Sequence, residues 1–551
     1  MNATSEPVEL PPRYYLANFQ RLCDTVAHQY ADLLDARERD FLSRFEAAGE
    51  ELRCLYVRLV SRRGPLFRSE QLNYPELGDL APVLEEGLRS GMLVQEDDPD
   101  FHRLAALLRK PELVEIYAGQ IDKSIRKPEL VAGLYASLPE ADLLEQWRHW
   151  RDDTHRLVAP ADVEVVDFFK LLFFGNSYQD LTEFVVSDLG HTNYPAYPLE
   201  ADYRLFNDRA EIEEYLELQT LKTAYKSAVA ADDPGTVVAV ARQLLERGSG
   251  PATESLRDRL RNRVGRQLER YELPGEAVAL YRVCGEHPAR QRLTRLLSDQ
   301  QPEAALALCE SIQQAPWCEA EVDFARRTMP TLSKRVGGQS NPVRRDRFEE
   351  EHLGLPYSQP VERAAALHYA ESWPEVHYVE NWLCNASFGL AFWEQIFAAV
   401  PGAFINPFQA APLDMYSPGF YPTRRAAIDT RLETLASADI AETLLDAFDR
   451  YQGLTNSWVG WRGAHRELLE TAFTTIPREH WLAIWRRMLF DPEANRNGFP
   501  DLIALDPGQG YCLIEVKGPG DQLQLNQRRW LRYFQAQGIP ARIAKVTWVD
   551  G

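Results

Sequence analysis

The stretch Gly498-Phe499-Pro500-Asp501-Leu502, followed by Leu513-Ile514-Glu515-Val516-Lys517-Gly518, decides the fold of the C-terminal part of this chain. Apolar and polar residues alternate in three segments there, which predicts β-strands over residues 501–505, 511–517 and 541–548. The residues between the first two segments, Asp-Pro-Gly-Gln-Gly at 506–510, are typical of a tight turn. The first two strands are therefore expected to form a hairpin.

One helix is predicted between the second and third strands, over residues 523–537. Asp521 is expected to cap its start, with Gln524 in the reciprocal capping position. Apolar residues at three- and four-residue spacing predict further helices upstream, over residues 360–400 and 426–489. The order of helices, strand, strand, helix and strand predicts a small α/β unit.

Two carboxylates and one amine converge in the predicted hairpin. Side chains alternate between the faces of a strand, so Glu515 and Lys517 point the same way and Val516 points to the opposite, buried face. Asp501 opens the neighbouring strand, and the tight turn lets it reach the same corner. Charges placed in an apolar sheet are costly unless something compensates them, and a divalent cation would do so.

The residue types at this corner predict a particular chemistry. Oxygen ligands suit hard cations, so Asp501, Glu515 and the carbonyl of Val516 predict a site for Mg²⁺ or Mn²⁺. A cation there would polarise a phosphodiester and activate a bound water. The compact charge of Lys517 would orient that water or stabilise the transition state. The predicted reaction is hydrolysis of a phosphodiester by metal-activated water.

The P-D…E-x-K pattern resembles that of a virus-type replication-repair nuclease (VRR-NUC) domain of the PD-(D/E)xK superfamily. The motifs that carry this likeness are Gly-Phe-Pro-Asp-Leu at 498–502, Glu-Val-Lys-Gly-Pro-Gly-Asp at 515–521 and Gln-Arg-Arg-Trp-Leu at 527–531. Nearly the whole chain resembles the Fanconi-associated nuclease family, also through Tyr-Tyr-Leu-Ala-Asn-Phe at 14–19 and Phe-Gly-Leu at 388–390. The resemblance implies a structure-specific endonuclease and 5′ exonuclease that cuts 5′ flaps and branched DNA, with a role in interstrand crosslink repair.

The same resemblance implies two further active-site residues. In this family an extra Glu from a helix before the strands joins the metal site, and the matching position here is Glu380. Glu375 and Glu371 remain open as alternatives. Gln527 is implied as an active-site hydrogen-bonding residue, with an ordinary surface glutamine as the alternative. Trp530, three residues further on, is expected in the core.

Cationic residues in the N-terminal region are candidates for DNA contacts. The helical pattern over residues 13–94 carries Arg58, Arg62 and Arg63, which could grip duplex phosphates. Residues 103–138 contain the phrase Lys-Pro-Glu-Leu-Val twice, which predicts two short helices and resembles a SAP-type DNA-binding module. Its candidate DNA contacts are Lys110, Lys123, Arg126 and Lys127.

The middle of the chain, over residues 216–332, is a run of amphipathic helices. Pro-Gly at 234–235 recurs at 274–275 before similar apolar residues, which favours degenerate helical repeats of tetratricopeptide type, with an ordinary helical bundle as the alternative. Most of the arginines there are expected to pair with the chain's own acidic residues, and others to guide a DNA flap.

We therefore predict a multidomain protein that is mostly α-helical in its N-terminal and middle regions and ends in an α/β PD-(D/E)xK nuclease domain. The expected domains are an N-terminal helical DNA-binding domain (1–98), a SAP-like module with a helical connector (99–215), TPR-like repeats (216–335) and a VRR-NUC nuclease domain (345–551).

The composition is that of a globular protein, with 45% hydrophobic and 26% charged residues. No run of about 18 apolar residues occurs, so no membrane span is expected. The seven scattered cysteines form no C-x-x-C pair, which favours a reducing compartment and excludes a ubiquitin-binding zinc finger from this sequence. We expect a minimal, bacterial-style member of the family in the cytoplasm or on the nucleoid, or in the nucleus if the source is eukaryotic. Because the net charge is −21, DNA binding would depend on local cationic clusters.

Other functions remain open from the sequence. The same metal site could act on four-way junctions or on RNA. A non-catalytic DNA-binding scaffold would need the helical repeats but not the three polar residues of the hairpin. The presence of Asp501, Glu515 and Lys517 together favours an enzyme. The sequence leaves the oligomeric state open.

Overall fold

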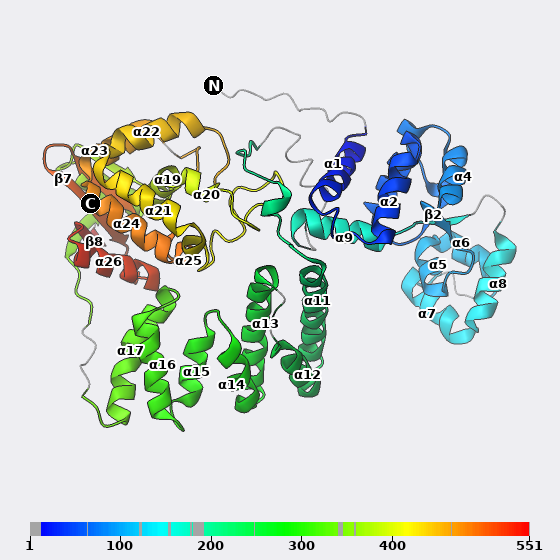
Figure 1. Cartoon of the computed structure of the whole chain (residues 1–551), viewed down its shortest axis with the longest axis horizontal. Coiled ribbons are helices and arrows are strands. Elements are labelled where there is room, and N and C mark those ends of the chain that lie inside the picture. Colours follow the sequence, from blue (N-terminus) through cyan, green and yellow to red (C-terminus); the bar gives the residue numbers. More distant parts are fainter. Residues whose placement is uncertain are drawn as a thin grey trace. The chain divides into compact units, whose positions relative to one another are not determined.

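The computed structural model divides the chain into two compact units, Met1–Thr192 and Asn193–Gly551. It describes residues 13–62, 64–120, 124–151, 156–176, 179, 192–246, 248, 250–339, 345–357, 360–463 and 465–549. Two of the predicted DNA contacts, Arg63 and Lys123, lie outside these ranges. Figure 1 follows the chain from the N-terminal helices in blue to the C-terminal strands in red.

The first unit begins with a helical layer and a small antiparallel sheet. Its elements are α1 (Tyr14–Gln29), α2 (Ala36–Ala47), α3 (Glu50–Val60), β1 (Phe67–Arg68), α4 (Leu80–Ser90), β2 (Leu93–Gln95), β3 (Leu157–Pro160) and α9 (Val163–Phe174). The strand order is β1-β3-β2. Phe19, Phe41 and Tyr56 are fully buried where α1, α2 and α3 meet, which explains the three- and four-residue apolar spacing of this region. The helical prediction is confirmed, but the two- and three-residue strands were missed.

A four-helix module follows in the same unit. It comprises α5 (Phe101–Leu107), α6 (Lys110–Ile116), α7 (Lys127–Ser137) and α8 (Glu140–Trp150). Pro111 and Pro128 stand at the second residue of α6 and α7, where the missing N–H costs no helical hydrogen bond. Leu113, Leu130 and Trp147 form part of the buried core of this module. The two predicted helices correspond to α6 and α7, and the helices α5 and α8 on either side of them were missed.

The second unit opens with a row of helices, drawn in green in Figure 1. They are α11 (Arg209–Ala230), α12 (Pro234–Leu244), α13 (Pro251–Arg270), α14 (Pro274–Val283), α15 (Ala289–Leu297), α16 (Pro302–Gln314) and α17 (Glu319–Arg335). Four of these helices begin with a proline, whose fixed φ suits the first helical position. Each helix packs on its neighbour along the chain around a shared apolar core.

A five-stranded sheet and its covering helices complete the second unit. The strands are β4 (Glu350–Pro356), β5 (Glu375–Tyr378), β6 (Leu502–Asp506), β7 (Gly510–Lys517) and β8 (Ala541–Val549). The helices are α18 (Val361–Tyr369), α19 (Trp382–Ala391), α20 (Trp393–Ile396), α21 (Phe420–Ser437), α22 (Ile440–Tyr451), α23 (Arg466–Thr475), α24 (Arg478–Phe490), α25 (Pro492–Asn495) and α26 (Leu525–Gln537). These elements occupy the yellow-green to red part of Figure 1.

The sheet has the order β4-β8-β7-β6-β5, so β7 lies at its centre. The hairpin partners β6 and β7 are antiparallel, whereas β8 runs parallel to both β7 and β4. The three predicted strands and the helix between the last two are confirmed, to within one or two residues at the strand ends. Strands β4 and β5 were missed, and β5 interrupts the helical stretch that was predicted over residues 360–400.

Each face of the sheet is buried by different helices. Ile503 and Leu513 join the large core that contains Trp485 and Trp530, from α24 and α26. On the opposite face, Ile514 and Val516 belong to a smaller core that is covered by α18. Because both faces of β7 are covered, any polar side chain on that strand is also drawn into the interior.

The start of α26 differs from the prediction. Its N-cap is Gln524, and the helix begins at Leu525. Gln527 supplies the reciprocal cap, since its Oε1 accepts a hydrogen bond from the Gln524 N–H at 2.9 Å. The predicted cap, Asp521, instead accepts a hydrogen bond from the Gly518 N–H at 3.1 Å and so closes the turn after β7. A carboxylate engaged in that turn cannot cap a helix that starts four residues later.

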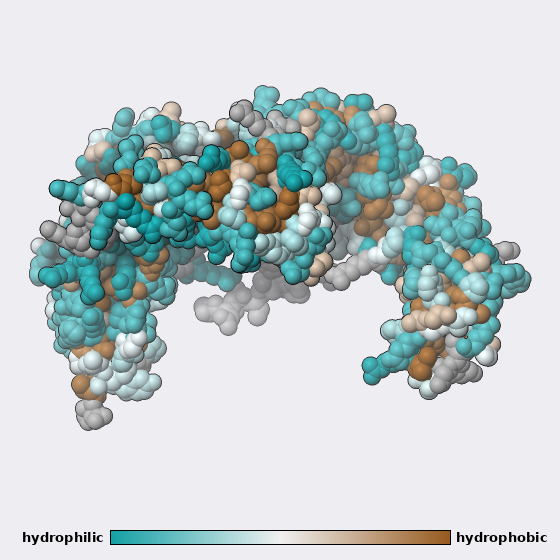
Figure 2. All heavy atoms as spheres, turned by 90° about the horizontal axis from the view of Figure 1, so that it is seen from below, coloured by the Kyte–Doolittle hydropathy of each residue, from teal (hydrophilic) through white to brown (hydrophobic). Residues whose placement is uncertain are grey.

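The surface is mixed in character. Among the described residues, no helix is long and apolar enough to cross a membrane. The face drawn in Figure 2 is mostly hydrophilic, with apolar side chains in separate patches.

Candidate active site

The hairpin brings Asp501 and Glu515 face to face. Leu502 pairs with Ile514 in the antiparallel register, and extending that register by one residue places Asp501 opposite Glu515. The carboxylate of Asp501 accepts a hydrogen bond from the Val516 N–H at 2.8 Å. The N–H and C=O of one strand residue point to the same side, so the Val516 carbonyl faces the same edge as Asp501. The prediction that Val516 itself turns its side chain to the opposite face agrees with its place in the core under α18.

Glu515 is a fully buried acid. Lys517 Nζ lies 2.7 Å from its Oε1, and the side chain of Lys517 is itself mostly buried. Oε2 has no hydrogen-bond partner among the described residues. Burial raises the pKa of Glu515 to about 7, and the charges of Asp501 and Glu380 add to the shift while Lys517 opposes it. The protein thus keeps a buried carboxylate at this corner with one oxygen that accepts no hydrogen bond from the described residues.

Burial also raises the pKa of Asp501, against the opposing effects of the Val516 N–H and Lys517. The charges of Glu362 and Glu380 raise it further. Asp501 and Glu515 are therefore both disfavoured in their charged forms, which is the setting in which a bound cation has most to compensate.

Glu380 lies in the loop between β5 and α19, and not within a helix as the resemblance implied. Its backbone has a φ of 39°, in the left-handed region that residues with a Cβ seldom adopt. The N–H groups of Val379 and Glu380 both donate to the Asp501 carbonyl, at 2.9 and 3.1 Å. Glu375, the alternative to Glu380, lies on β5 and contacts His377. Of these two acids it is Glu380 whose charge raises the pKa values of Asp501 and Glu515.

These donors suit a divalent cation. Buried and semi-buried carboxylates with a free oxygen, together with a backbone carbonyl, form the hard-oxygen set that Mg²⁺ and Mn²⁺ prefer. In the described part of the chain, however, no three His, Cys, Asp or Glu side chains already meet closely enough to hold a metal ion.

Comparison with known proteins places this site in a family. The VRR-NUC domain model matches residues 436–548, the "FAN1, HTH domain" model matches residues 13–94, and the "Fanconi anemia-associated nuclease SAP domain" model matches residues 102–147. The Fanconi-associated nuclease 1 homolog of Pseudomonas aeruginosa is 34% identical to this chain over 98% of both chains. The chain belongs to the Fanconi-associated nuclease family.

More distant relatives and a solved structure agree. The Fanconi-associated nuclease 1 homolog of Arabidopsis thaliana is 25% identical over 99% of this chain and 68% of its own length. The crystal structure of paFAN1 bound to 2nt 5′ flap DNA with gap matches with a TM-score of 0.80 and 32% identity, over 98% of this chain and 100% of that chain. This family member is a structure-specific DNA nuclease, a hydrolase whose type of nuclease domain depends on a divalent metal. The comparisons do not favour the alternative of a non-catalytic DNA-binding scaffold. They confirm the predicted SAP-type module, because the SAP domain model matches residues 102–147.

Residues near the site that sequence reasoning missed are Glu362, Tyr378 and Asn381. Glu362 lies in the first turn of α18 and acts on the pKa of Asp501. Tyr378 and Asn381 each hydrogen-bond to Glu380. They flank Glu380 within two residues, so the segment 378–381 carried a signal, whereas Glu362 is brought in by the fold alone. The predicted core position of Trp530 is confirmed, since it is fully buried.

A cavity of about 430 Å³ opens beside Lys517 at the end of β7. His352, Arg528 and Lys545 are among the residues that line it. Gln527 lies next to Arg528 on α26, but its Oε1 is already used in the helix cap. The active-site role that the resemblance implies for Gln527 therefore stays a prediction.

The predicted DNA contacts of the first unit differ in availability. Arg58 Nη2 lies 2.7 Å from Glu76 Oε1 and its guanidinium covers the Tyr15 ring, so it already has an intramolecular partner. Arg62 is exposed and donates to the Tyr74 hydroxyl at 3.0 Å. At the starts of α6 and α7, Lys110 is half-buried, Arg126 is exposed, and Lys127 donates to the Ala106 carbonyl at 3.1 Å.

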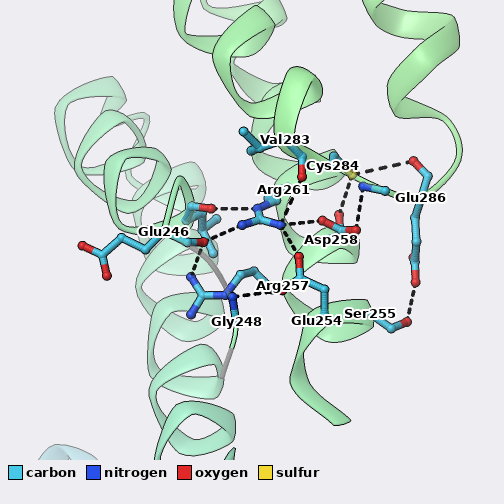
Figure 3. A network of polar contacts seen from close by, with 12 residues as sticks. Glu246, Gly248, Glu254, Ser255, Arg257, Asp258, Arg261, Val283, Cys284 and Glu286 are labelled. Carbon is cyan, nitrogen blue, oxygen red and sulfur yellow. Dashed lines mark hydrogen bonds and ion pairs between the residues drawn. The ribbon is translucent and has the colours of Figure 1, made fainter. Parts of the chain in front are cut away.

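The arginines of α13 divide into an inner and an outer set. Figure 3 shows the inner set, in which Arg261 is the centre of a network. Its Nη1 lies 2.7 Å from both Asp258 Oδ1 and Glu254 Oε1, and its Nε donates to the Leu244 carbonyl at 2.7 Å. Arg257, one turn away, pairs with Glu214 at 2.7 Å. These two arginines hold α13 against α11 and α12.

The outer set forms a cationic face, which we name the arginine face. Its residues are Lys222 and Lys226 of α11, Arg259, Arg263, Arg266 and Arg270 of α13, and Arg292 and Arg295 of α15. Five of these residues line a groove of about 540 Å³. Burial lowers the pKa of Lys222 and that of Arg295, and neighbouring cations lower both further. Glu269 is the one carboxylate of the described residues that forms ion pairs within this set.

Proposed function

We propose that this protein cuts the strand that carries a 5′ flap in branched DNA, using Mg²⁺ or Mn²⁺ held at the corner of the β6–β7 hairpin. The observation that carries the proposal is the fully buried Glu515, whose Oε2 has no hydrogen-bond partner among the described residues and which lies opposite Asp501. The flap substrate is supported by paFAN1, a similar protein whose crystal structures contain 5′ flap DNA. The physiological part of the proposal is the repair of interstrand crosslinks, on the nucleoid of a bacterium or in the nucleus of a eukaryote.

In this proposal Glu380, Asp501, Glu515 and the Val516 carbonyl hold the cation. When bound, the cation supplies a Lewis acid and lowers the pKa of a coordinated water. Lys517 Nζ is held 2.7 Å from Glu515 Oε1, so its ammonium would lie beside the residues that hold the cation. Its positive charge would stabilise the extra negative charge of the transition state. Gln527 would contribute a hydrogen bond from the first turn of α26.

The hollow beside Lys517 gives the cleaved strand a place to lie. Arg528 and His352 line it, and the guanidinium of Arg528 can neutralise a phosphate that flanks the cut.

Three cationic surfaces would hold the duplex arms. Arg62 in the N-terminal domain and Lys110, Arg126 and Lys127 in the SAP-type module would contact backbone phosphates, as would Arg63 and Lys123 beyond the described residues. The arginine face of the second unit would do the same. In a chain of net charge −21, eight clustered cations create local repulsion that a phosphate backbone relieves. Contacts of this kind read shape and not sequence.

The test is cleavage of end-labelled 5′-flap, 3′-flap, four-way-junction and linear duplex DNA, with Mg²⁺, Mn²⁺ or EDTA. The proposal predicts metal-dependent cutting of the 5′ flap in preference to the other substrates, and loss of that cutting in Asp501→Ala. Asp506→Ala, at the far end of β6, is the matched control and should cut normally. Preferred cutting of the four-way junction, or cutting that survives Asp501→Ala, would overturn the proposal.

A further inference from the structure

The segment Tyr378-Val379-Glu380-Asn381 has features that the proposed function does not use. Tyr378 ends β5, and α19 starts at Trp382, so the chain must turn between them. The turn is made with Glu380 in a left-handed conformation, although glycine would adopt it without steric cost. A strained residue that carries a carboxylate at the edge of an active site needs a reason other than chain connectivity.

The backbone of this turn is tied to the catalytic hairpin. Val379 and Glu380 both donate their N–H groups to the Asp501 carbonyl, at 2.9 and 3.1 Å. The Cα of Glu380 is thereby fixed beside Asp501, whatever its side chain does. The side chain is exposed, so without further contacts it could sweep through several rotamers into the solvent.

Two neutral donors hold that side chain. The Tyr378 hydroxyl donates to Glu380 Oε2 at 3.0 Å, and Asn381 Nδ2 donates to Glu380 Oε1 at 3.2 Å. Each carboxylate oxygen therefore has one donor, and neither donor is a cation. Glu515, in contrast, is oriented by burial and by Lys517.

Asn381 also reaches the loop that leads into Asp501. Its Oδ1 accepts hydrogen bonds from the N–H groups of Gly498 and Phe499, at 2.9 and 3.2 Å. Gly498 has a φ of 92° and packs so closely on Asn526 of α26 that a Cβ would lie within 2.9 Å of it. One amide side chain thus links Glu380 to the fixed loop two residues before Asp501.

We propose that Tyr378 and Asn381 are positioning residues, which hold the Glu380 carboxylate where it can join Asp501 and Glu515 around a divalent cation. The proposal rests on the proposed function, in which Glu380 is a metal ligand. The side chain of Glu380 is the exposed one of the three, so it depends on these two donors to keep its place beside Asp501. Outer donors that orient a ligating carboxylate typically change metal affinity 10- to 100-fold when they are removed.

The test is the affinity of the DNA-free full chain for Mn²⁺, measured by isothermal titration calorimetry. Tyr378→Phe removes the hydroxyl and keeps the ring, and Asn381→Ala removes the amide. Each is expected to weaken binding by roughly 10- to 100-fold. The concentration of Mn²⁺ that gives half-maximal flap cleavage should rise by the same factor, with the rate at saturating Mn²⁺ changed much less.

Two further variants make the result decisive. Tyr357→Phe alters a tyrosine that is 77% exposed at the end of β4, and it should bind Mn²⁺ as the wild type does. Glu380→Gln separates the two proposals: if it binds Mn²⁺ normally, Glu380 is not a ligand and the proposed metal set fails. If Glu380→Gln weakens binding but Tyr378→Phe binds as tightly as the wild type or tighter, this inference alone is overturned. Should Asn381→Ala fail to fold, Tyr378→Phe decides the outcome, with its thermal unfolding in EDTA as the check on folding.

Discussion

Metal binding by this nuclease should displace a proton from Glu515. Burial, Asp501 and Glu380 raise the pKa of Glu515 from 4.5 to about 7 in the metal-free protein. An acid of that pKa is about 90% protonated at pH 6 and about 10% protonated at pH 8. A carboxylate must be deprotonated to bind a metal. We therefore expect release of about 0.9 proton per cation at pH 6 and about 0.1 at pH 8 from this group.

The same shift sets the pH dependence of affinity. Below pH 7 the apparent affinity for Mn²⁺ should fall about tenfold per pH unit, because one proton competes with the cation. The raised pKa of Asp501 acts in the same direction. Without metal, the raised pKa of Glu515 destabilises the folded state above pH 7, and stability is regained as the pH falls from 7 towards 4.5. For this residue the difference is at most roughly 3 kcal/mol.

The assay is calorimetric titration of Mn²⁺ into the DNA-free protein at pH 6 and pH 8, in buffers with different heats of protonation. The difference in heat between buffers gives the number of protons released. Glu375→Gln is the matched control, since Glu375 contacts His377 on β5 and should leave both affinity and proton count unchanged. Equal proton release at the two pH values, or an affinity that is flat from pH 6 to 8, would show that Glu515 does not lose a proton when the cation binds.

Three further predictions concern basic residues of α13 and the lysine beside Glu515. Arg261→Ala leaves the buried Asp258 without its cation and should lower the free energy of unfolding by about 3–5 kcal/mol, read from urea denaturation; a loss below 1 kcal/mol would contradict it. Arg263→Ala and Arg266→Ala change the exposed side of the same helix, so they should leave the free energy of unfolding unchanged but weaken flap binding. Each should reduce the slope of log affinity against log salt concentration by about 0.9. An unchanged slope would remove the arginine face from the proposal. Lys517→Met should slow cleavage by roughly 10²- to 10³-fold while flap affinity is retained, and a rate within threefold of the wild type would exclude it from the chemistry.

The central hairpin could be predicted because its signals are local. Alternating side chains marked the strands, and the turn residues fixed which strands pair, so Asp501 was expected near Glu515 and Lys517 beside it. The edge strands β4 and β5 gave no such signal, since Glu375–Tyr378 has only four residues and is held by its register with β6. The cap of α26 was misassigned because Asp521 and Gln524 are both plausible caps, and the turn after β7 had already taken Asp521.

The surroundings of the site depend on tertiary structure. Glu380 reaches Asp501 through a left-handed turn and backbone hydrogen bonds across the β5–β6 edge, which no helical periodicity reveals. Glu362 approaches from α18, over a hundred residues before the hairpin. In contrast, the three- and four-residue spacing of a helix is enough to assign the arginines of α13 to two sides. Arg257 and Arg261 fall on the buried side, and the outer arginines fall on the exposed side. The sequence therefore carried more information on the arginine face than the prediction used.

The most direct test of the proposed metal centre is the anomalous diffraction of Mn²⁺ in crystals of the protein with a 5′-flap DNA. We expect an anomalous peak bonded to the carboxylates of Glu380, Asp501 and Glu515 and to the Val516 carbonyl, at about 2.0–2.2 Å. A peak elsewhere, or a peak that persists in Asp501→Ala crystals at the same place, would contradict it.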